Sequence, residues 1–445
     1  MGSRDGWRPT PYQILSLGFA GVILLGALLL MTPWVAQGGK GLSFIDALFT
    51  ATSAVCVTGL VVVDTGTYFN TAGQLIVISL IQIGGLGFMT MATMMSIAFG
   101  KRINLRERLI MQEALNQLNY SGVVRLTLNV LKITLAIEFV GGTVLAWRFF
   151  QDYGWYGIYL GYWHAISSFC NAGFDLIGGF RSMTPYVGDV AINLAITFLI
   201  ILGGTGFTVI LELLQRRGRL GQCSLHTRIV VLTTAFLIVF GAAGIYMLES
   251  HNPATFGPLS TSERVLASYF QSVSPRTAGY NTIDIGSMRD VTIFFTVILM
   301  FIGASPSSTG GGIKTSTFAI LVLSAWSLIR GKTDVNFFNR SIDERTVHRA
   351  FVITAIAATL VTGMTLVLAA MEDLPFLHLL FEVTSAFGTV GLTCGVTTSL
   401  SDASKLLITL TMFAGRVGPL TLALALALKA RRGLIRYPEG RIIIG

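Results

Sequence analysis

The chain has 445 residues, of which 53% are hydrophobic and only 12% are charged, whereas an average soluble domain has about 25% charged residues. This composition excludes an ordinary soluble globular protein and predicts an integral membrane protein. The formal net charge is +9. Because the basic residues gather beside apolar segments, we interpret this charge as a topology signal and expect no nucleic-acid partner.

Eight apolar segments are predicted to cross the membrane, since a spanning helix needs about 20 apolar residues. Four shorter apolar stretches are predicted to be re-entrant helices that enter and leave on the same side. In chain order, the predicted spans are 11–33, 72–99, 123–147, 189–214, 228–248, 290–329 (broken by a polar middle), 349–371 and 403–428, and the short stretches are 43–60, 158–174, 262–280 and 374–392.

The orientation follows from the basic residues. Most of the 31 lysine and arginine residues lie between one pair of spans and the next, or at the two termini. The positive-inside rule makes that side cytoplasmic. We therefore predict a multi-pass protein of the cell membrane with both termini in the cytoplasm and with the short stretches entering from outside.

An internal repeat is the main signal. Each short stretch ends in a turn of small residues with one glycine, reading VTGL (57–60), NAGF (171–174), TAGY (277–280) and TVGL (389–392). The repeat divides the chain into units 1–100, 101–220, 221–340 and 341–445. Each unit has two crossings, so the units are parallel, unlike the inverted repeats of many carriers. The predicted fold is an all-α integral membrane protein in which four parallel M1-P-M2 repeats (span, pore helix, span) surround a pseudo-fourfold pore.

The turn side chains carry no charge, so any bound cation must be held by backbone carbonyl groups. Rings of carbonyls replace the hydration shell of a monovalent cation, and glycine permits the backbone angles that this needs. Helix packing by small residues is the alternative for these glycines, but the fourfold repetition after short helices favours a selectivity filter. The candidate ion-binding residues are Val57, Thr58, Gly59, Asn171, Ala172, Gly173, Thr277, Ala278, Gly279, Thr389, Val390 and Gly391.

Three acidic residues follow the turns closely. Asp64, Asp175 and Asp284 are predicted to concentrate cations at the outer mouth.

The stretch GASPSSTGGGIKTST (303–317) resembles a phosphate-binding loop, but Ile313 separates Gly312 from Lys314, so the P-loop pattern fails. Its apolar flanks place it inside the membrane, where a break in a helix is tolerated beside a wet cavity. We predict a gate. The alternative for Lys314 is that its side chain reaches the cytoplasmic membrane interface. The alternative for Arg416 is a structural role. The candidate gate residues are Gly303, Ser305, Pro306, Ser307, Ser308, Thr309, Gly310, Gly311, Gly312, Lys314 and Arg416.

The four units with one glycine turn each, the interruption at 303–317 and GRVGP at 415–419 resemble the Trk/Ktr/HKT superfamily of potassium transporters, most closely the membrane subunit of a bacterial Ktr system. The resemblance implies a homodimer in lipid, coupled to a cytosolic ring of nucleotide-binding regulatory subunits. It also implies that Gly59 favours potassium over sodium, and that Arg416 faces a gating loop. Val57 and Asn171 depart from the T-x-G pattern of the other two turns.

The predicted function is potassium uptake through a channel-like pore, with potassium at the filter carbonyls as substrate. We expect no enzymatic activity and no cofactor in this chain, and we leave open whether sodium activates the flux. An alternating-access symporter coupled to sodium or protons is the alternative. Lys132 and Glu138, inside the third span, are interpreted as a structural pair or as interfacial groups.

Overall fold

The structure is a computed structural model that describes residues 10–87, 90, 110, 112, 123–332, 334–418 and 421. Several predicted features lie outside these residues. They are the ends of the spans 72–99 and 403–428, the basic segment that joins the first two units, and both termini.

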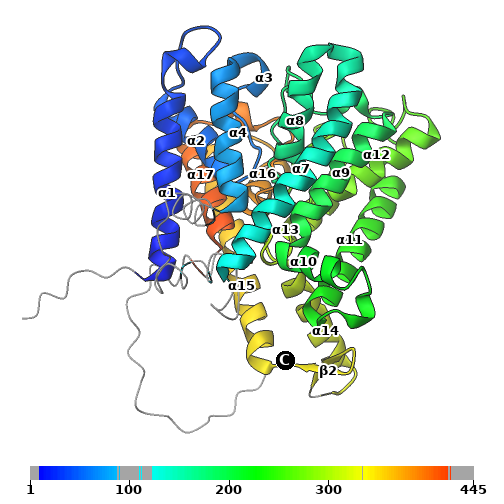
Figure 1. Ribbon diagram of the computed structural model, residues 1–445. Coiled ribbons are helices and arrows are strands. Elements are labelled where there is room, and N and C mark those ends of the chain that lie inside the picture. Colours follow the sequence, from blue (N-terminus) through cyan, green and yellow to red (C-terminus); the bar gives the residue numbers. More distant parts are fainter. Residues whose placement is uncertain are drawn as a thin grey trace, which may run out of the picture.

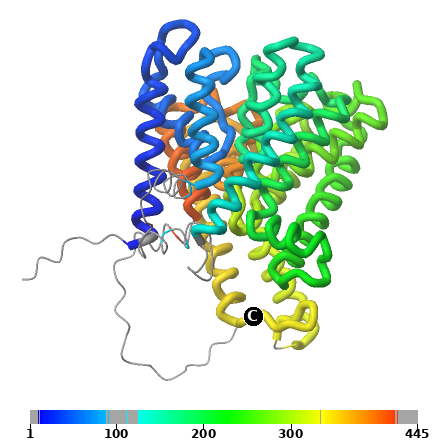
Figure 2. Tube along the Cα trace, viewed as in Figure 1, coloured from blue at the N-terminus to red at the C-terminus, as the bar shows by residue number. Residues whose placement is uncertain are grey.

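The described residues form a helical bundle whose long helices run roughly side by side (Figures 1 and 2). Every predicted span and every predicted short stretch contains at least one helix. The first helices of the four units are α1 (Pro11–Leu30), α7 (Val123–Tyr153), α11 (Leu225–Glu249) and α15 (Glu344–Met371). The short helices that follow them are α2 (Phe44–Val55), α8 (Trp155–Phe169), α12 (Thr261–Val273) and α16 (Phe376–Gly388).

The last helices of the units are more irregular. They are α4 (Thr71–Leu86), the pair α9 (Val190–Thr205) and α10 (Phe207–Gln215), the pair α13 (Asp290–Phe301) and α14 (Thr315–Ile329), and α17 (Asp402–Val417). Short connecting elements are η1 (Pro33–Val35), α3 (Thr65–Tyr68), η2 (Thr184–Tyr186), η3 (Leu220–Gln222) and η4 (Thr397–Ser399).

The lengths of the observed helices do not by themselves give the eight membrane crossings that the sequence predicts. Among the described residues, four helices are long and apolar enough to cross a membrane, or five if α9 and α10 count as one bent span. The four are the first helices of the units, and two-thirds or more of the most apolar part of each is not buried inside the protein. Such outward apolar faces suit contact with lipid. The chain is therefore a multi-pass membrane protein, while the number eight stays a prediction.

The short helices occupy the interior, and they link the units in a closed order. The last helix of each unit packs against the short helix of the next: α4 against α8, α9 against α12, and α13 against α16. In the fourth unit, α17 packs against α2 of the first. Residues near the two ends of the chain thus become neighbours in the core.

Glycine allows this close packing. The carbonyl oxygen of Val55, at the end of α2, lies where a side chain at Gly84 would be. Gly203 has the same relation to the Phe169 carbonyl, and Gly415 to the Phe387 carbonyl. Any larger residue would collide with the end of a short helix, so each glycine fixes the distance between the two helices.

The span predicted at 189–214 is not continuous. It bends by 98° between α9 and α10, because Gly206 has φ 98° and ψ 134°, angles that no helix contains. The sequence analysis expected a break only in the third unit. Gly87 and Gly418 end α4 and α17 with nearly the same angles, so a glycine in this conformation follows a helix in the last part of three units.

One small departure from an all-α fold lies between α14 and α15. Strands β1 (Val335–Phe337) and β2 (Arg340–Ile342) form an antiparallel hairpin in which Val335 pairs with Ile342 and Phe337 with Arg340. The turn residues Phe338 and Asn339 both have positive φ, as a two-residue hairpin requires. The hairpin lies at the same end of the bundle as α10 and the start of α15 (Figure 1).

Candidate functional site: a ring of glycine turns above an intramembrane loop

The four glycine turns share one backbone conformation. The first residue of each has φ between 51° and 79°, at Val57, Asn171, Thr277 and Thr389. The glycines, Gly59, Gly173, Gly279 and Gly391, have φ between 69° and 94°. Positive φ is uncommon for residues other than glycine, above all for the β-branched Val57 and for threonine. The departure of Val57 and Asn171 from the T-x-G pattern therefore does not change the shape of their turns.

The turns also meet one another. The carbonyl oxygen of the middle residue of one turn lies beside the glycine of another, where a side chain would collide with it. These contacts form a closed cycle: Ala172 to Gly59, Ala278 to Gly173, Val390 to Gly279 and Thr58 to Gly391. We call residues 57–59, 171–173, 277–279 and 389–391 the turn ring. All of its residues are buried.

Serine hydroxyls form hydrogen bonds with the backbone of the turn ring and of the residues that follow it. The Oγ of Ser53 accepts a hydrogen bond from the Gly59 amide at 3.0 Å, and Ser385 does the same for Gly391 at 3.0 Å. Ser167 donates to the Phe174 carbonyl at 2.8 Å, and Ser274 donates to the Tyr280 carbonyl. The sequence analysis missed these residues. The signal was present in the sequence. A serine stands six residues before the glycine in the turns of the first, second and fourth units, and five residues before it in the turn of the third unit.

Four helix ends point at the turn ring. Helices α2, α8, α12 and α16 all end within four residues of its nearest member. Each helix carries a partial negative charge at its C-terminal end. The combined field of the four ends favours a cation at the ring.

The polar interruption lies directly against the turn ring. It runs from residue 303 to 314, because residues 315–317 already belong to α14, and we call it the intramembrane loop. Its two ends are paired through a bridge between Ile302 and Ile313. The Gly311 amide donates to Thr389 Oγ1 at 2.8 Å, and Gly310 lies against Thr277 Oγ1.

The other side of the intramembrane loop fills the break in the second unit. The Ser305 amide donates to the Gly204 carbonyl at 2.9 Å, and the Thr309 amide to the Gly203 carbonyl at 3.3 Å. In return the Phe207 amide donates to the Ser307 carbonyl at 2.9 Å. These bonds satisfy backbone groups that the bend at Gly206 leaves without helical partners. The bend and the loop therefore stabilise each other.

Two basic side chains hold the intramembrane loop. The Arg416 guanidinium, from α17, donates to the Thr309 carbonyl and to the Gly84 carbonyl, and it lies 3.4 Å from the Gly85 carbonyl. Lys314 Nζ donates to the Gly310 carbonyl at 2.6 Å. Neither side chain is paired with a carboxylate among the described residues.

The remaining predicted gate residues contact other residues of the loop or the ends of the helices beside it. Ser305 Oγ lies 2.9 Å from Thr315 Oγ1, and Ser308 Oγ donates to the Ser305 carbonyl at 2.6 Å. The Pro306 carbonyl packs against Gly206, and Gly303 packs against Gly311 and Gly312.

The three acids that the sequence analysis expected at the outer mouth all accept hydrogen bonds. Asp64 accepts from the Thr67 and Phe180 amides at 3.0 and 2.7 Å. Asp175 accepts from the Ile177 amide at 3.0 Å, and Asp284 from Ser287 Oγ at 2.5 Å. Burial and the neighbouring Asp64 carboxylate raise the pKa of Asp175 to about 6, against the opposing effect of backbone amides.

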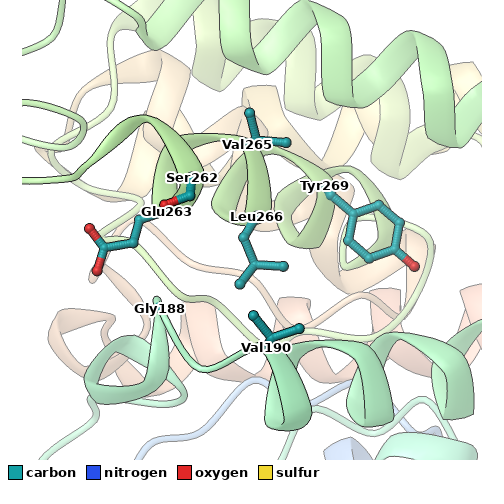
Figure 3. A pocket seen from close by; sticks show the side chains of 7 residues that line it. All are labelled: Gly188, Val190, Ser262, Glu263, Val265, Leu266 and Tyr269. Carbon is teal, nitrogen blue, oxygen red and sulfur yellow. The ribbon is translucent and has the colours of Figure 1, made fainter.

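A separate pocket of about 290 Å³ lies at the start of α12, where Leu266 points toward Val190 across a gap (Figure 3) and Glu263 lies beside Gly188. Ser260 and Glu263 form a capping box there. The pocket contains no residue of the turn ring. It is a feature of the surface and not of the candidate site.

Residues 8–433 match the family model of TrkH, which is described as a cation transport protein. The chain belongs to the TrkH family. This membership confirms the resemblance to the Trk/Ktr membrane subunits.

Individual members of the family are similar to this TrkH-family chain over nearly its whole length. It is 45% identical to the Ktr system potassium uptake protein B of Bacillus subtilis over 98% of this chain and 97% of the relative. It is 39% identical to the potassium/sodium uptake protein NtpJ of Enterococcus hirae, over 98% of each. The crystal structure of TrkH from Vibrio parahaemolyticus shares the fold, with a TM-score of 0.74 at 18% identity, over 96% of this chain and 86% of that one.

The TrkH-family chain also contains a buried acid that the sequence analysis interpreted differently. Glu138 is buried, and its Oε2 accepts from Gln82 Nε2 at 3.2 Å. Gln82 Oε1 in turn accepts from Cys170 Sγ at 3.4 Å. Lys132 is exposed on the same helix, so the two residues are not a pair. A helix position six residues away faces a different direction, which the apolar pattern alone did not reveal.

Proposed function

We propose that this chain is the pore-forming subunit of a bacterial potassium uptake system. Potassium passes from outside through the turn ring, where backbone carbonyls replace its hydration shell. The four repeats surround this pore with pseudo-fourfold symmetry, and both termini lie in the cytoplasm. The observation that carries the proposal is the closed cycle in which a carbonyl oxygen of each turn lies beside the glycine of another.

The intramembrane loop is the gate of this pore. Its contacts with Thr277 and Thr389 place it against one side of the turn ring. A permeant ion that leaves the ring on that side meets the loop, Lys314 and Arg416 next. Two positive charges beside the path oppose a cation, and moving the loop removes the steric barrier and carries Lys314 away from the path.

Regulation comes from a separate cytosolic subunit. The names of the relatives from Bacillus subtilis and Vibrio alginolyticus include the words Ktr system, which suits a membrane subunit with partners. We propose a homodimer in lipid that binds a ring of nucleotide-binding subunits through its basic cytoplasmic segments. Co-purification with such a subunit from the same organism tests this, and failure to co-elute under conditions where both proteins are folded would contradict it.

The filter is tested by Gly391→Ser, with Gly395→Ser as a matched control. Both glycines have positive φ, 92° and 87°, but only Gly391 lies against a carbonyl of another turn, whereas nothing lies within 4 Å of the side-chain position at Gly395. Rubidium uptake is measured in cells that lack their own potassium uptake systems. We expect Gly391→Ser to raise the KM for rubidium about tenfold or more and to weaken the preference over sodium, since a shift of about 1.4 kcal/mol in ion binding suffices. Equal effects of the two substitutions would show that backbone strain, and not the ring, is responsible.

Nothing in the described residues favours the alternating-access symporter. Single-channel recording distinguishes it from a pore, because a carrier turns over one substrate at a time and gives no unitary current.

A further inference from the structure

An apolar groove of about 500 Å³ opens between α11, α13 and α14. Apart from Thr233, every side chain that lines it is apolar. Its walls include Phe236 and Phe240 of α11, Ile298 of α13, Ile302 just after α13, and Ala319 and Val322 of α14. We call it the hairpin groove, because Phe337 of the hairpin strand β1 is among the residues that line it.

The hairpin groove exists because the third unit is broken. α13 ends at Phe301 and α14 begins only at Thr315, so one continuous helix does not cover α11. The wall on α11 is aromatic: the rings of Phe236 and Phe240 stack with centroids 5.6 Å apart. Phe236 is 58% exposed and Val322 is 50% exposed, so the groove faces outward along a helix that is long and apolar enough to span the membrane. A groove of this kind is filled by hydrocarbon and not by water.

The part of the hairpin groove beside β1 has a positive charge next to it. The Arg228 guanidinium lies 5.4 Å from the centre of the Phe338 ring, which packs edge-on against Phe337. Arg228 donates to the Cys223 carbonyl at 3.0 Å and to the Gly221 carbonyl. Among the described residues it has no carboxylate partner. An arginine that is positioned by neutral groups keeps its full charge for an anion.

A second arginine lies at the same end of α14. The Arg330 guanidinium lies 4.6 Å from the centre of the Trp326 ring, and both residues are exposed. Tryptophan and arginine together are typical of the level at which lipid headgroups meet the hydrocarbon. The end of the hairpin groove therefore lies at headgroup depth, with positive charge beside it.

We propose that the hairpin groove binds one acyl chain of an anionic phospholipid whose phosphate contacts Arg228. The occupant would touch the frame of the intramembrane loop, because Ile302 lines the groove and is paired with Ile313 across the base of that loop. This second part rests on the proposed function of the loop as a gate. The first part, the lipid site, does not.

The test is native mass spectrometry of the full chain in detergent, after equilibration with phosphatidylglycerol or with phosphatidylcholine. The unmodified protein is expected to retain phosphatidylglycerol in preference. Ala319→Trp, on the groove floor, and Val322→Trp, on its exposed rim, should each reduce retention about tenfold, because the indole displaces methylene groups that contribute to binding. Val322→Trp adds its ring at a half-exposed position, so it keeps the test valid if Ala319→Trp fails to fold.

Matched controls separate the site from general lipid contact. Leu135→Trp adds the same ring on α7, where Leu135 is 53% exposed, and should leave retention unchanged. Arg228→Gln should abolish the preference for phosphatidylglycerol while phosphatidylcholine is still retained, whereas Arg345→Gln, at an exposed arginine on α15, should preserve the preference.

Unchanged lipid retention in both groove-filling variants would overturn the proposal. So would a shift from dimer to monomer in the same spectra with retention unchanged, because a second copy of the chain would then cover the groove. Potassium flux is measured separately in vesicles of each lipid. The lipid-binding result stands whether or not flux is observed, so failure of the transport proposal is distinguishable from failure of this one.

Discussion

The Arg416 guanidinium connects the Thr309 carbonyl of the intramembrane loop to the Gly84 carbonyl of α4. These two acceptors come from the third and the first units, and the arginine comes from the fourth. One planar side chain with several donors in a fixed geometry is suited to such a bridge. The position of the loop therefore depends on three units at once.

Arg416→Met should increase rubidium uptake. Hydrogen bonds from a charged donor each contribute roughly 1.5–3 kcal/mol, so their loss should shift the loop toward its open position about tenfold or more. The substitution also removes one of the two positive charges beside the path. Arg416→Lys keeps the charge but cannot bridge both carbonyls, so it should give an intermediate rate. The measurement is the initial rate of uptake, normalised to folded protein in the membrane. A rate for Arg416→Met at or below that of the unmodified protein would contradict a restraining role.

Deletion of residues 305–312 should also raise flux. The deletion removes the segment that contacts Thr277 and Thr389 but leaves Ile302 and Ile313, which close the base of the loop. We expect the selectivity between potassium and sodium to stay unchanged, because the turn ring is intact. Gel filtration in detergent checks that the deletion variant folds, and a folded variant with unchanged or lower flux would show that the loop is no gate.

Removing a hydroxyl behind the ring should weaken selectivity. Ser53→Ala and Ser385→Ala each delete the acceptor of a ring glycine amide, which costs about 1 kcal/mol and leaves a buried amide unpaired. The ratio of potassium to sodium uptake should fall severalfold. Ser399→Ala is the control, since Ser399 Oγ donates a 2.8 Å bond to the Val396 carbonyl in a loop away from the ring. A similar loss of selectivity in Ser399→Ala would mean that the effect is not specific to the ring.

Acid pH should weaken apparent affinity through Asp175. Its pKa is raised to about 6 by burial and by Asp64, with Arg181 and backbone amides acting in the opposite direction. Above pH 6 the carboxylate is mostly ionised and attracts cations, and below pH 6 it is mostly neutral. The KM for rubidium should therefore rise as the external pH falls from 8 to 5.

Two variants separate this acid from the other acids of the mouth. Asp175→Asn should give a KM that is high at every pH and nearly flat over this range. Asp284→Asn removes the same charge from an exposed position and should keep the pH dependence of the unmodified protein. If Asp175→Asn retains the full pH dependence, another group is responsible.

The repeat made much of this architecture predictable. Glycines that recur at regular intervals after short apolar stretches located the turns, because glycine readily adopts the positive φ that a turn after a helix requires. Apolar length located a helix in every predicted segment but did not give its ends, since α7 runs to Tyr153 whereas the prediction ended at 147. The interruption at 303–317 was visible as polar residues between two apolar runs.

Contacts between distant segments were not predictable in this way. The bend at Gly206 depends on hydrogen bonds with the backbone of Ser305, Ser307 and Thr309, which lie about a hundred residues away. A glycine within an apolar run is equally compatible with close helix packing. The partners of Arg416 were also hidden, because they are backbone carbonyls, which leave no trace in the pattern of side chains.

The closed order of packing has a consequence for biosynthesis. Helix α2 is among the first segments to leave the ribosome, yet it packs against α17, near the other end of the chain. Asp46 of α2 forms an ion pair with Lys405 of α17, with 2.7 Å between Asp46 Oδ1 and Lys405 Nζ. This pair cannot form until α17 has been synthesised. Because chains emerge at about 5–20 residues per second, α2 spends tens of seconds without its last neighbour. A nascent chain that stops before α17 leaves the cycle open, so truncated products should be recognised as incomplete by membrane quality control.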